Sequence, residues 1–184
     1  MISRHALASL GLVLLAAGTL AACASMTAGP VGNPAVPQPA KPVDLTRYGG
    51  LWYELARYEN RFERDCEAVT AEYRRRSDGV IEVVNSCHKA AVSGPVKVAR
   101  GRAKVVEGSQ DAKLRVSFFG PFFGDYWVLD HADDYSWSIV GEPSGRYLWL
   151  LTREAKPPAA QQERLMTRVK ELGYDTRLLR MTAH

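Results

Sequence analysis

The sequence has few of the residues from which catalytic and metal centres are usually built. It contains three cysteines and four histidines among 184 residues. It has no G-x-S-x-G segment, no phosphate-binding P-loop and no paired-cysteine zinc pattern. His5 lies in the N-terminal segment, His184 is the last residue, and His88 and His131 fall at the ends of expected strands. We therefore expect no catalytic residue set, no metal ion and no cofactor.

Long apolar runs and clusters of like charge are also missing. The apolar stretch at residues 6–15 is too short to span a bilayer comfortably. Lys and Arg number 24 against 20 Asp and Glu, and the two signs alternate along most of the chain. This pattern argues against a nucleic-acid partner. The net charge of +4 favours an anionic lipid surface or an anionic ligand head group.

The N-terminal segment is typical of a bacterial lipoprotein. A short polar start precedes the apolar run, and small residues lead to the segment L-A-A-C at 20–23, which resembles a lipobox. The resemblance implies removal of residues 1–22 and acylation of Cys23, because several acyl chains make a stable anchor. Ala24 in place of Asp implies sorting to the outer membrane, with the domain facing the periplasm. The alternative is an ordinary secretory signal in which Cys23 stands by chance.

Residues 23–43 are predicted to form a tether between this anchor and the folded domain. The stretch from Ala24 to Pro42 is small, rich in proline and nearly uncharged, so it cannot build a core of its own. We expect it to be extended, and the folded domain to occupy residues 44–184.

The folded part of the sequence reads as short β segments separated by turn signals. Ser77-Asp78-Gly79 is a hairpin signal. Residues 113–119 alternate plainly, with Leu114, Val116 and Phe118 on one face of the segment. The eight expected strands are Leu51–Tyr58, Ala68–Arg76, Val80–His88, Val96–Glu107, Lys113–Phe119, Asp125–His131, Ser136–Gly141 and Tyr147–Arg153.

A helical period replaces the β period after the eighth segment. Leu165, Val169 and Leu172 recur at helical spacing within residues 159–172, and Gly173 suits the C-terminal stop. The sequence therefore predicts an all-β fold with one helix. Its architecture is an eight-stranded antiparallel up-and-down β-barrel followed by a C-terminal amphipathic helix.

Three ordered motifs resemble those of the lipocalin family. Gly50-x-Trp52 stands at the start of the first strand, Gly124-Asp125-Tyr126 occupies the place of a T-D-Y-like element, and Arg153 ends the eighth strand. Gly124 departs from the usual Thr. The sequence is similar to the bacterial outer-membrane and apolipoprotein D-like members over residues 44–184. The resemblance implies that Trp52 plugs the closed end with Arg153 stacked on its indole, which makes both residues structural. We expect Gly50 to allow a tight entry into the strand.

Cys66 and Cys87 flank the hairpin formed by the second and third strands. An oxidising periplasm would permit a bridge between them. Closing a loop of about 20 residues would stabilise the fold by about 3 kcal/mol. Two free thiols or a metal site are the alternatives to the expected disulfide, and a free Cys66 would permit a thiol-dependent enzyme of the lipocalin type.

On the fourth strand, small residues lie on one face and cationic residues lie on the other. The cationic face should meet solvent, so the small residues face the barrel interior and indicate that it is unfilled. The resemblance implies a fatty acid or lysophospholipid as the ligand, with aromatic residues in contact with its acyl chain. Arg61 and Arg64 are candidates for an anionic head group. The expected contacts with the rest of the ligand are Phe123, Trp149, Tyr126, Ala99, Gly101, Ala103, Val83 and Val116.

The expected function is lipid storage, transport or envelope maintenance by a barrel that binds its ligand within the lumen. A structural envelope lipoprotein with a filled barrel is the alternative from another class. The sequence does not decide between a monomer and a homodimer.

Overall fold

The computed structural model describes residues 29–184. The expected signal peptide and Cys23 lie outside the described residues. Within the described part of the chain, no helix has the length and apolar character needed to cross a bilayer.

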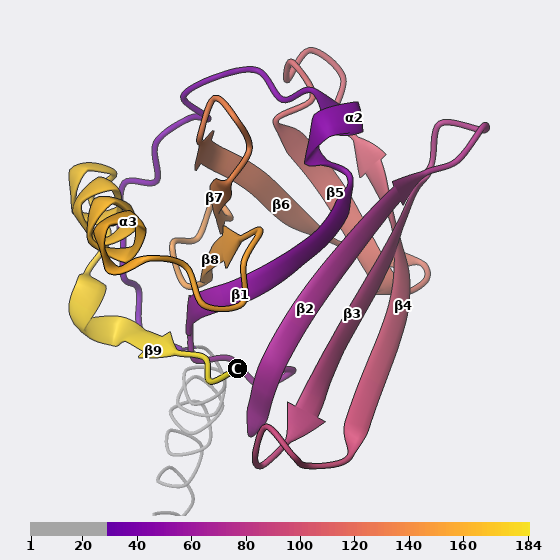
Figure 1. The fold of residues 1–184 in the computed structure, drawn as a ribbon. Helices are drawn as coiled ribbons and strands as arrows, with labels where there is room; N and C mark the ends of the chain where they lie inside the picture. Colours follow the sequence, from indigo (N-terminus) through magenta and orange to yellow (C-terminus); the bar gives the residue numbers. More distant parts are fainter. Residues whose placement is uncertain (1–28) are drawn as a thin grey trace, which may run out of the picture.

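Eight antiparallel strands close into a barrel, as the sequence predicts (Figure 1). Each strand pairs with the next along the chain, from β1–β2 to β7–β8. The pairing of β8 with β1 closes the ring. The strands are β1 (Gly50–Tyr58), β2 (Cys66–Arg75), β3 (Ile81–Lys89), β4 (Val96–Val105), β5 (Lys113–Phe119), β6 (Phe122–His131), β7 (Trp137–Gly141) and β8 (Leu148–Thr152).

The observed strand ends agree with the expected ones to within three residues. The largest difference is at β6, which begins at Phe122 rather than Asp125, so two residues join it to β5. A ninth strand, β9 (Leu179–Met181), lies outside the barrel and pairs with β1, preceded by a short 3-10 turn, η1 (Thr176–Leu178).

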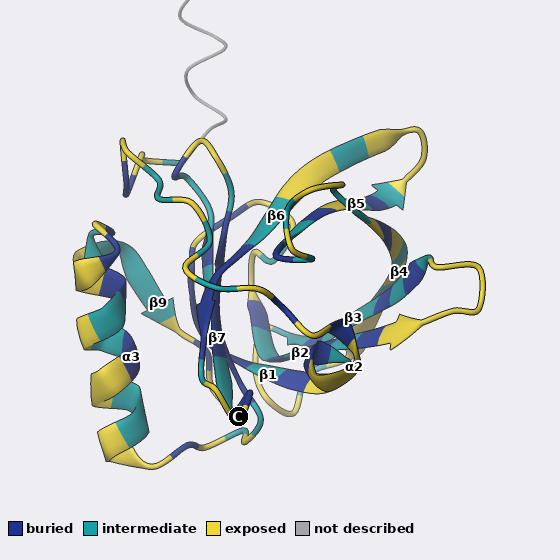
Figure 2. Cartoon of the chain, turned by 90° about the horizontal axis from the view of Figure 1, so that it is seen from above, coloured by how far each residue is buried: buried dark blue, intermediate teal, exposed yellow. Residues whose placement is uncertain are grey.

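The C-terminal helix α3 (Ala159–Glu171) lies against the outer wall of the barrel. Figure 2 shows its buried residues along the side that faces the strands. Leu165 and Val169 are fully buried there, in a core shared with Leu129, Ile139 and Leu150 of the barrel wall. Burial of one helical face supplies the hydrophobic stabilisation that an isolated helix of this length lacks.

A four-residue helix, α2 (Leu45–Tyr48), precedes the first strand. The side chain of Asp44 caps it by accepting hydrogen bonds from the backbone N–H groups of Thr46 and Arg47. A single helical turn has too few residues to show a period in the sequence, which is why the expected single helix of the fold becomes two.

The proline-rich stretch is attached to the barrel wherever the structure describes it. At one end of the barrel the Gly32 N–H donates to the carbonyl of Gly145 at 2.9 Å, and at the other the Val43 N–H donates to Gln110 at 3.0 Å. Residues 29–43 thus run along the wall (indigo in Figure 1), whereas the sequence predicts a free extended tether there. We call these residues the N-terminal strap. Their prolines keep the backbone extended, and the intervening residues supply the N–H donors.

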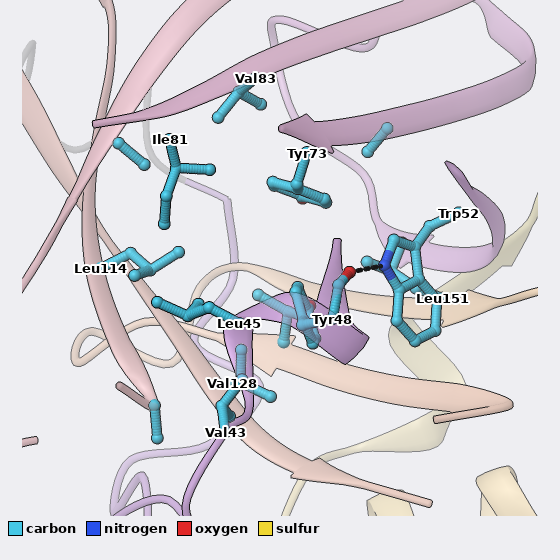
Figure 3. Packing of buried hydrophobic residues seen from close by; sticks show 14 of the residues in the cluster. Val43, Leu45, Tyr48, Trp52, Tyr73, Ile81, Val83, Leu114, Val128 and Leu151 are labelled. Carbon is cyan, nitrogen blue, oxygen red and sulfur yellow. Dashed lines mark hydrogen bonds between the residues drawn. The ribbon is translucent and has the colours of Figure 1, made fainter. Parts of the chain in front are cut away.

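Trp52 and α2 fill the end of the barrel at which β1 begins, hereafter the closed end (Figure 3). Trp52 is fully buried, and its indole N–H donates to the Tyr48 carbonyl at 2.8 Å. The Arg153 guanidinium lies 3.7 Å from the centre of the indole ring, as the resemblance implies. It also donates to the carbonyls of Leu51 and Gly49.

The expected disulfide is present. Cys66 and Cys87 are bonded, with their Cα atoms 5.5 Å apart, at the start of β2 and the end of β3. Both cysteines are buried together with Val69. The Cys66 sulfur is therefore not a free thiol in this structure.

Arg153→Met tests whether the stacked guanidinium holds the closed end together. The substitution keeps the aliphatic stem but removes the cation and its hydrogen bonds to the carbonyls of α2 and β1. We expect the free energy of unfolding to fall by about 2–4 kcal/mol in urea titrations. Arg177→Met is the matched control, because the Arg177 side chain is 87% exposed in a surface ion pair. Equal stability of the two variants would contradict this account.

Candidate functional site

The register of the sheet identifies the side chains that point into the barrel. Val116 pairs with Gly124, and Leu114 pairs with Tyr126, between β5 and β6. Paired residues point to the same face of a sheet. Because Leu114 and Val116 pack in the core that fills the barrel, Gly124 and Tyr126 also face the interior.

The inward side of Gly124 is not covered by other atoms. A Cβ atom placed on Gly124 would meet no atom within 4 Å. Ala99, Val116, Tyr126 and Trp149 also face inward, and all four remain partly accessible to solvent. We call the space bordered by these five residues the open lumen.

The rest of the interior is filled by the protein's own side chains. Val83 and Ala103, which the sequence predicts as ligand contacts, are 2% and 0% exposed and belong to the core. Gly101 leaves no space for a ligand either, because its missing Cβ position lies 2.8 Å from the ring of Phe118. Small residues in β4 thus make room for a neighbouring strand's side chain.

Phe123 lies outside the lumen, contrary to its predicted role. Because Gly124 faces inward, its neighbour Phe123 faces the opposite side of the sheet. The ring of Phe123 accordingly lies 5.6 Å from the guanidinium of Arg102, a residue of the outer face.

A network of hydroxyl groups forms the floor of the open lumen. The Tyr126 hydroxyl lies 2.8 Å from that of Tyr73 and 3.0 Å from that of Tyr48, which in turn lies 3.2 Å from the Ser138 hydroxyl. Each buried hydroxyl thus has a partner, and the network satisfies polar groups that an apolar core would otherwise penalise. It separates the open lumen from the filled closed end.

Burial keeps these tyrosines neutral. It raises the pKa of Tyr48 to about 12, although hydrogen bonds from Ser138 and Tyr126 lower it. Burial likewise raises the pKa of Tyr73 and of Tyr126. The floor is therefore an uncharged set of hydrogen-bonding groups at neutral pH.

Aromatic side chains and the Glu63 carboxylate border the opposite end of the barrel, the open end. Here the β1–β2, β3–β4, β5–β6 and β7–β8 loops lie. The rings of Phe62, Tyr147 and Trp149 stack in succession, with centroids 5.5 and 5.8 Å apart. The Trp149 indole N–H donates to the Glu63 carboxylate at 2.9 Å, and Asn60 also donates to it. Trp149 thus joins the lumen wall to the β1–β2 loop.

Arg61 and Arg64 lie in the same loop, and both are exposed. Neither has an ion-pair partner within residues 29–184. Both lie at the open end, as expected, and their contact with a ligand head group stays a prediction.

A buried ion pair closes the seam between β1 and β2 near the open end. Arg57 is fully buried, donates to Glu54 at 2.7 Å, and also donates to the carbonyl of Cys66 across the seam. Thr182 donates to the same Glu54 carboxylate. Burial raises the pKa of Glu54 above its ordinary value, while Arg57 beside it lowers it.

The described residues carry no cluster of groups suited to a metal ion. His131 contacts the backbone carbonyls of Ala132 and Pro42 through its two ring nitrogens, so it ties the strap to the barrel. A groove of about 720 Å³ lies outside the barrel between α3, β6 and β7. Its lining is largely charged, which makes it a poor site for an acyl chain.

The sequence predicts Tyr126 and Trp149 as ligand contacts, but it does not reveal the hydroxyl network or the loop residues of the site. The tyrosine floor joins residues 48, 73 and 126, which no local pattern connects. Glu63 and Tyr147 lie in loops, where hydrophobic periodicity carries no signal. One signal was available: Gly124 departs from the family's usual Thr, and the structure has open space at that position.

The fold and the inward-facing site are those of a lipocalin. A family model for the lipocalin-like domain matches residues 43–184, and the chain belongs to the lipocalin family. It is 40% identical over 158 residues to outer membrane lipoprotein Blc of Vibrio cholerae, covering 85% of this chain and 92% of that relative. The Escherichia coli protein of the same name is 39% identical over 133 residues, covering 72% and 74%.

The chain is also similar to one more distant sequence and to solved structures. Apolipoprotein D of Macaca fascicularis is 30% identical over 148 residues, covering 76% of both chains. The structure of insecticyanin from Manduca sexta superposes with a TM-score of 0.64 at 19% identity, covering 85% of this chain and 86% of that one. At that identity the likeness concerns the fold alone.

Alkaline titration tests the buried floor. Burial raises the pKa of five of the eight tyrosines: Tyr48, Tyr58, Tyr73, Tyr126 and Tyr174. A pKa raised in the folded state stabilises the fold below the unfolded value of about 10 and loses that contribution as pH rises through the folded value. We expect stability to fall between pH 10 and about 12, the pKa of Tyr48.

Ultraviolet absorbance of phenolate and circular dichroism should be followed together. Urea-unfolded protein provides the control in which every tyrosine titrates near pH 10. Complete phenolate formation near pH 10 in a barrel that is still folded would refute the buried network.

Proposed function

We propose that the chain binds one small amphipathic lipid, a fatty acid or a lysophospholipid, with its acyl chain in the open lumen. The single observation that carries the proposal is the vacant space at Gly124, bordered by Val116, Tyr126 and Trp149. Each buried CH₂ contributes about 0.8 kcal/mol, so a long chain in such a space needs few polar contacts.

The direction of the ligand follows from the two ends of the site. Trp52, Tyr48 and the core around them are packed and buried at the closed end, so in this proposal an acyl chain enters from the open end. Its head group then stays at that end, where Arg61 and Arg64 are exposed. An anionic head group gains from these cations, although solvent screens the interaction.

The proposed location is the outer membrane, with the domain in the periplasm. Support comes from the lipobox-like segment before Cys23 and from relatives that bear the name outer membrane lipoprotein. We propose binding rather than catalysis, because Cys66 is held in a disulfide and cannot act as a free nucleophile in this state.

Gly124→Phe tests the binding site directly. A phenyl ring at this position would occupy the open lumen, and the Gly124 backbone requires no left-handed conformation. We expect binding of a fluorescent fatty acid to weaken by about a hundredfold or more, because most of the apolar burial is lost. Thermal unfolding should change little.

Val98→Phe is the matched control. It adds the same ring to the outer face of β4, where Val98 is 51% exposed. Unchanged fatty-acid binding by Gly124→Phe would indicate a ligand outside the lumen. Absence of any bound lipid in native mass spectra of protein from its host, together with no binding in solution, would favour the structural lipoprotein instead.

The double variant Arg61→Ala/Arg64→Ala tests the head-group site. We expect affinity for a fatty acid to fall about three- to tenfold at low salt, as is typical of exposed charges. A fatty alcohol of the same length is the internal control, since it has no anionic group and should bind both proteins equally. Equal loss for the acid and the alcohol would assign the two arginines a structural role.

A further inference from the structure

The chain leaves the described structure at the open end of the barrel. A Cβ atom placed on Gly29 would lie 3.7 Å from the carbonyl oxygen of Glu59, which follows β1. The Gly29 carbonyl accepts a hydrogen bond from Arg146 in the β7–β8 loop. Both neighbours belong to the open end. The N-terminal strap holds this point in place, since it is bonded to the barrel from Gly32 to Val43.

The distance from this point to the expected anchor is short. Six residue steps separate Cys23 from Gly29. A fully extended chain spans at most about 3.3–3.6 Å per residue, so an acylated Cys23 lies no farther than about 20 Å from the open end. The closed end lies farther from the anchor, because the strap runs along the barrel wall before α2 begins.

The open end also carries exposed apolar side chains. Phe119 and Phe122, at the tip of the β5–β6 hairpin, are 82% and 78% exposed. Phe62 in the β1–β2 loop and Val92 in the β3–β4 loop are 50% and 41% exposed. Three of the four loops at this end thus carry exposed apolar side chains, and contiguous exposed apolar groups of this kind mark interaction sites.

Cations accompany these side chains. Arg61, Arg64, Lys97 and Arg146 lie at the same end, together with the acids Glu59, Glu63, Asp65 and Glu142. None of these four cations has an ion-pair partner within the described range. Aromatic groups flanked by arginine and lysine match the interface of an anionic bilayer.

The loops of the closed end have the opposite character. Asp78, Glu107, Asp111, Asp133 and Asp134 lie in the three loops there. Large exposed apolar side chains are absent from those loops, which the structure describes in full. Arg76 is the only cation in those loops, whereas the loops of the open end hold three cations and four acids. The closed end is thus the more acidic and the less apolar of the two.

We propose that the open end docks on the bilayer that holds the Cys23 anchor, with Phe119 and Phe122 inserted among the head groups. The occupant of this surface is an anionic phospholipid bilayer. The proposal rests on the acylation of Cys23 and extends the proposed function, because a lumen that opens onto the bilayer exchanges its lipid there without crossing water.

A site-specific fluorophore tests the docking. With Cys23 acylated and Cys66 bonded to Cys87, a cysteine introduced by Phe122→Cys is the only reactive thiol and can carry an environment-sensitive label. The full lipoprotein is reconstituted in vesicles of phosphatidylethanolamine and phosphatidylglycerol. We expect a blue-shifted label that is protected from iodide. The same label introduced by Asp78→Cys, in the β2–β3 turn, should stay quenchable.

Equal iodide quenching at the two positions would overturn the docking. So would an intact mass showing Cys23 without lipid, because the short link to the membrane would then be lost. Neither result depends on ligand binding, which is measured separately on the same preparations in detergent.

A transfer experiment links docking to exchange. The double variant Phe119→Ser/Phe122→Ser should transfer a fluorescent fatty acid to vesicles about tenfold more slowly, because its apolar contact with the bilayer is lost. Its equilibrium affinity for that fatty acid should be unchanged. Leu51→Ser, at a residue 42% exposed near the closed end, is the matched control. An unchanged transfer rate in the double variant would refute the role of the two phenylalanines, whereas loss of binding in the unsubstituted protein would refute the proposed function.

Discussion

The barrel is closed by a short run of antiparallel pairing between β1 and β2. Four residue pairs, from Gly50–Tyr73 to Tyr53–Thr70, complete the ring at the closed end. Beyond them β1 pairs with β9 instead, and Arg57 bridges the remaining seam by side-chain hydrogen bonds. The ring is thus held by backbone hydrogen bonds at the closed end and by side chains at the open end. This arrangement allows tight packing at the closed end and an open lumen at the other.

The lumen is the product of this asymmetry. At the closed end, Trp52, Arg153 and α2 fill the space and satisfy one another's polar groups. The tyrosine floor then provides a neutral boundary, because burial disfavours the phenolate form. Above it, Gly124 supplies no side chain, Val116 and Trp149 supply apolar wall, and Asn85 faces inward beside Ala99. The site therefore has the uncharged tyrosine floor at its base and charged side chains in contact with water at the open end.

Local pattern predicted the elements well and the site in part. The bounds of β5 were correct because its alternation is clear, and α3 was found from its helical period. The tertiary relations were not predictable in this way. Gly101 looked like room for a ligand until Phe118 of the next strand was placed over it. Phe123 faces outward because the register of β6 puts Gly124 inside. The strap appeared to be a tether because its bonding partners lie in distant loops.

The strap also determines how a mechanical load on the chain would be distributed. Gly32 and Asn33 bond to Gly145, Leu172 and Asp175, that is, to the β7–β8 loop and the region just after α3. A pull applied at residue 29 therefore acts first on these outer contacts. The force reaches the strands around Trp52 only after these contacts. The same holds for the tyrosine hydroxyl groups beneath the ligand space. Thermal undulation of a supporting membrane could thus strain the periphery of the molecule while its interior keeps its shape.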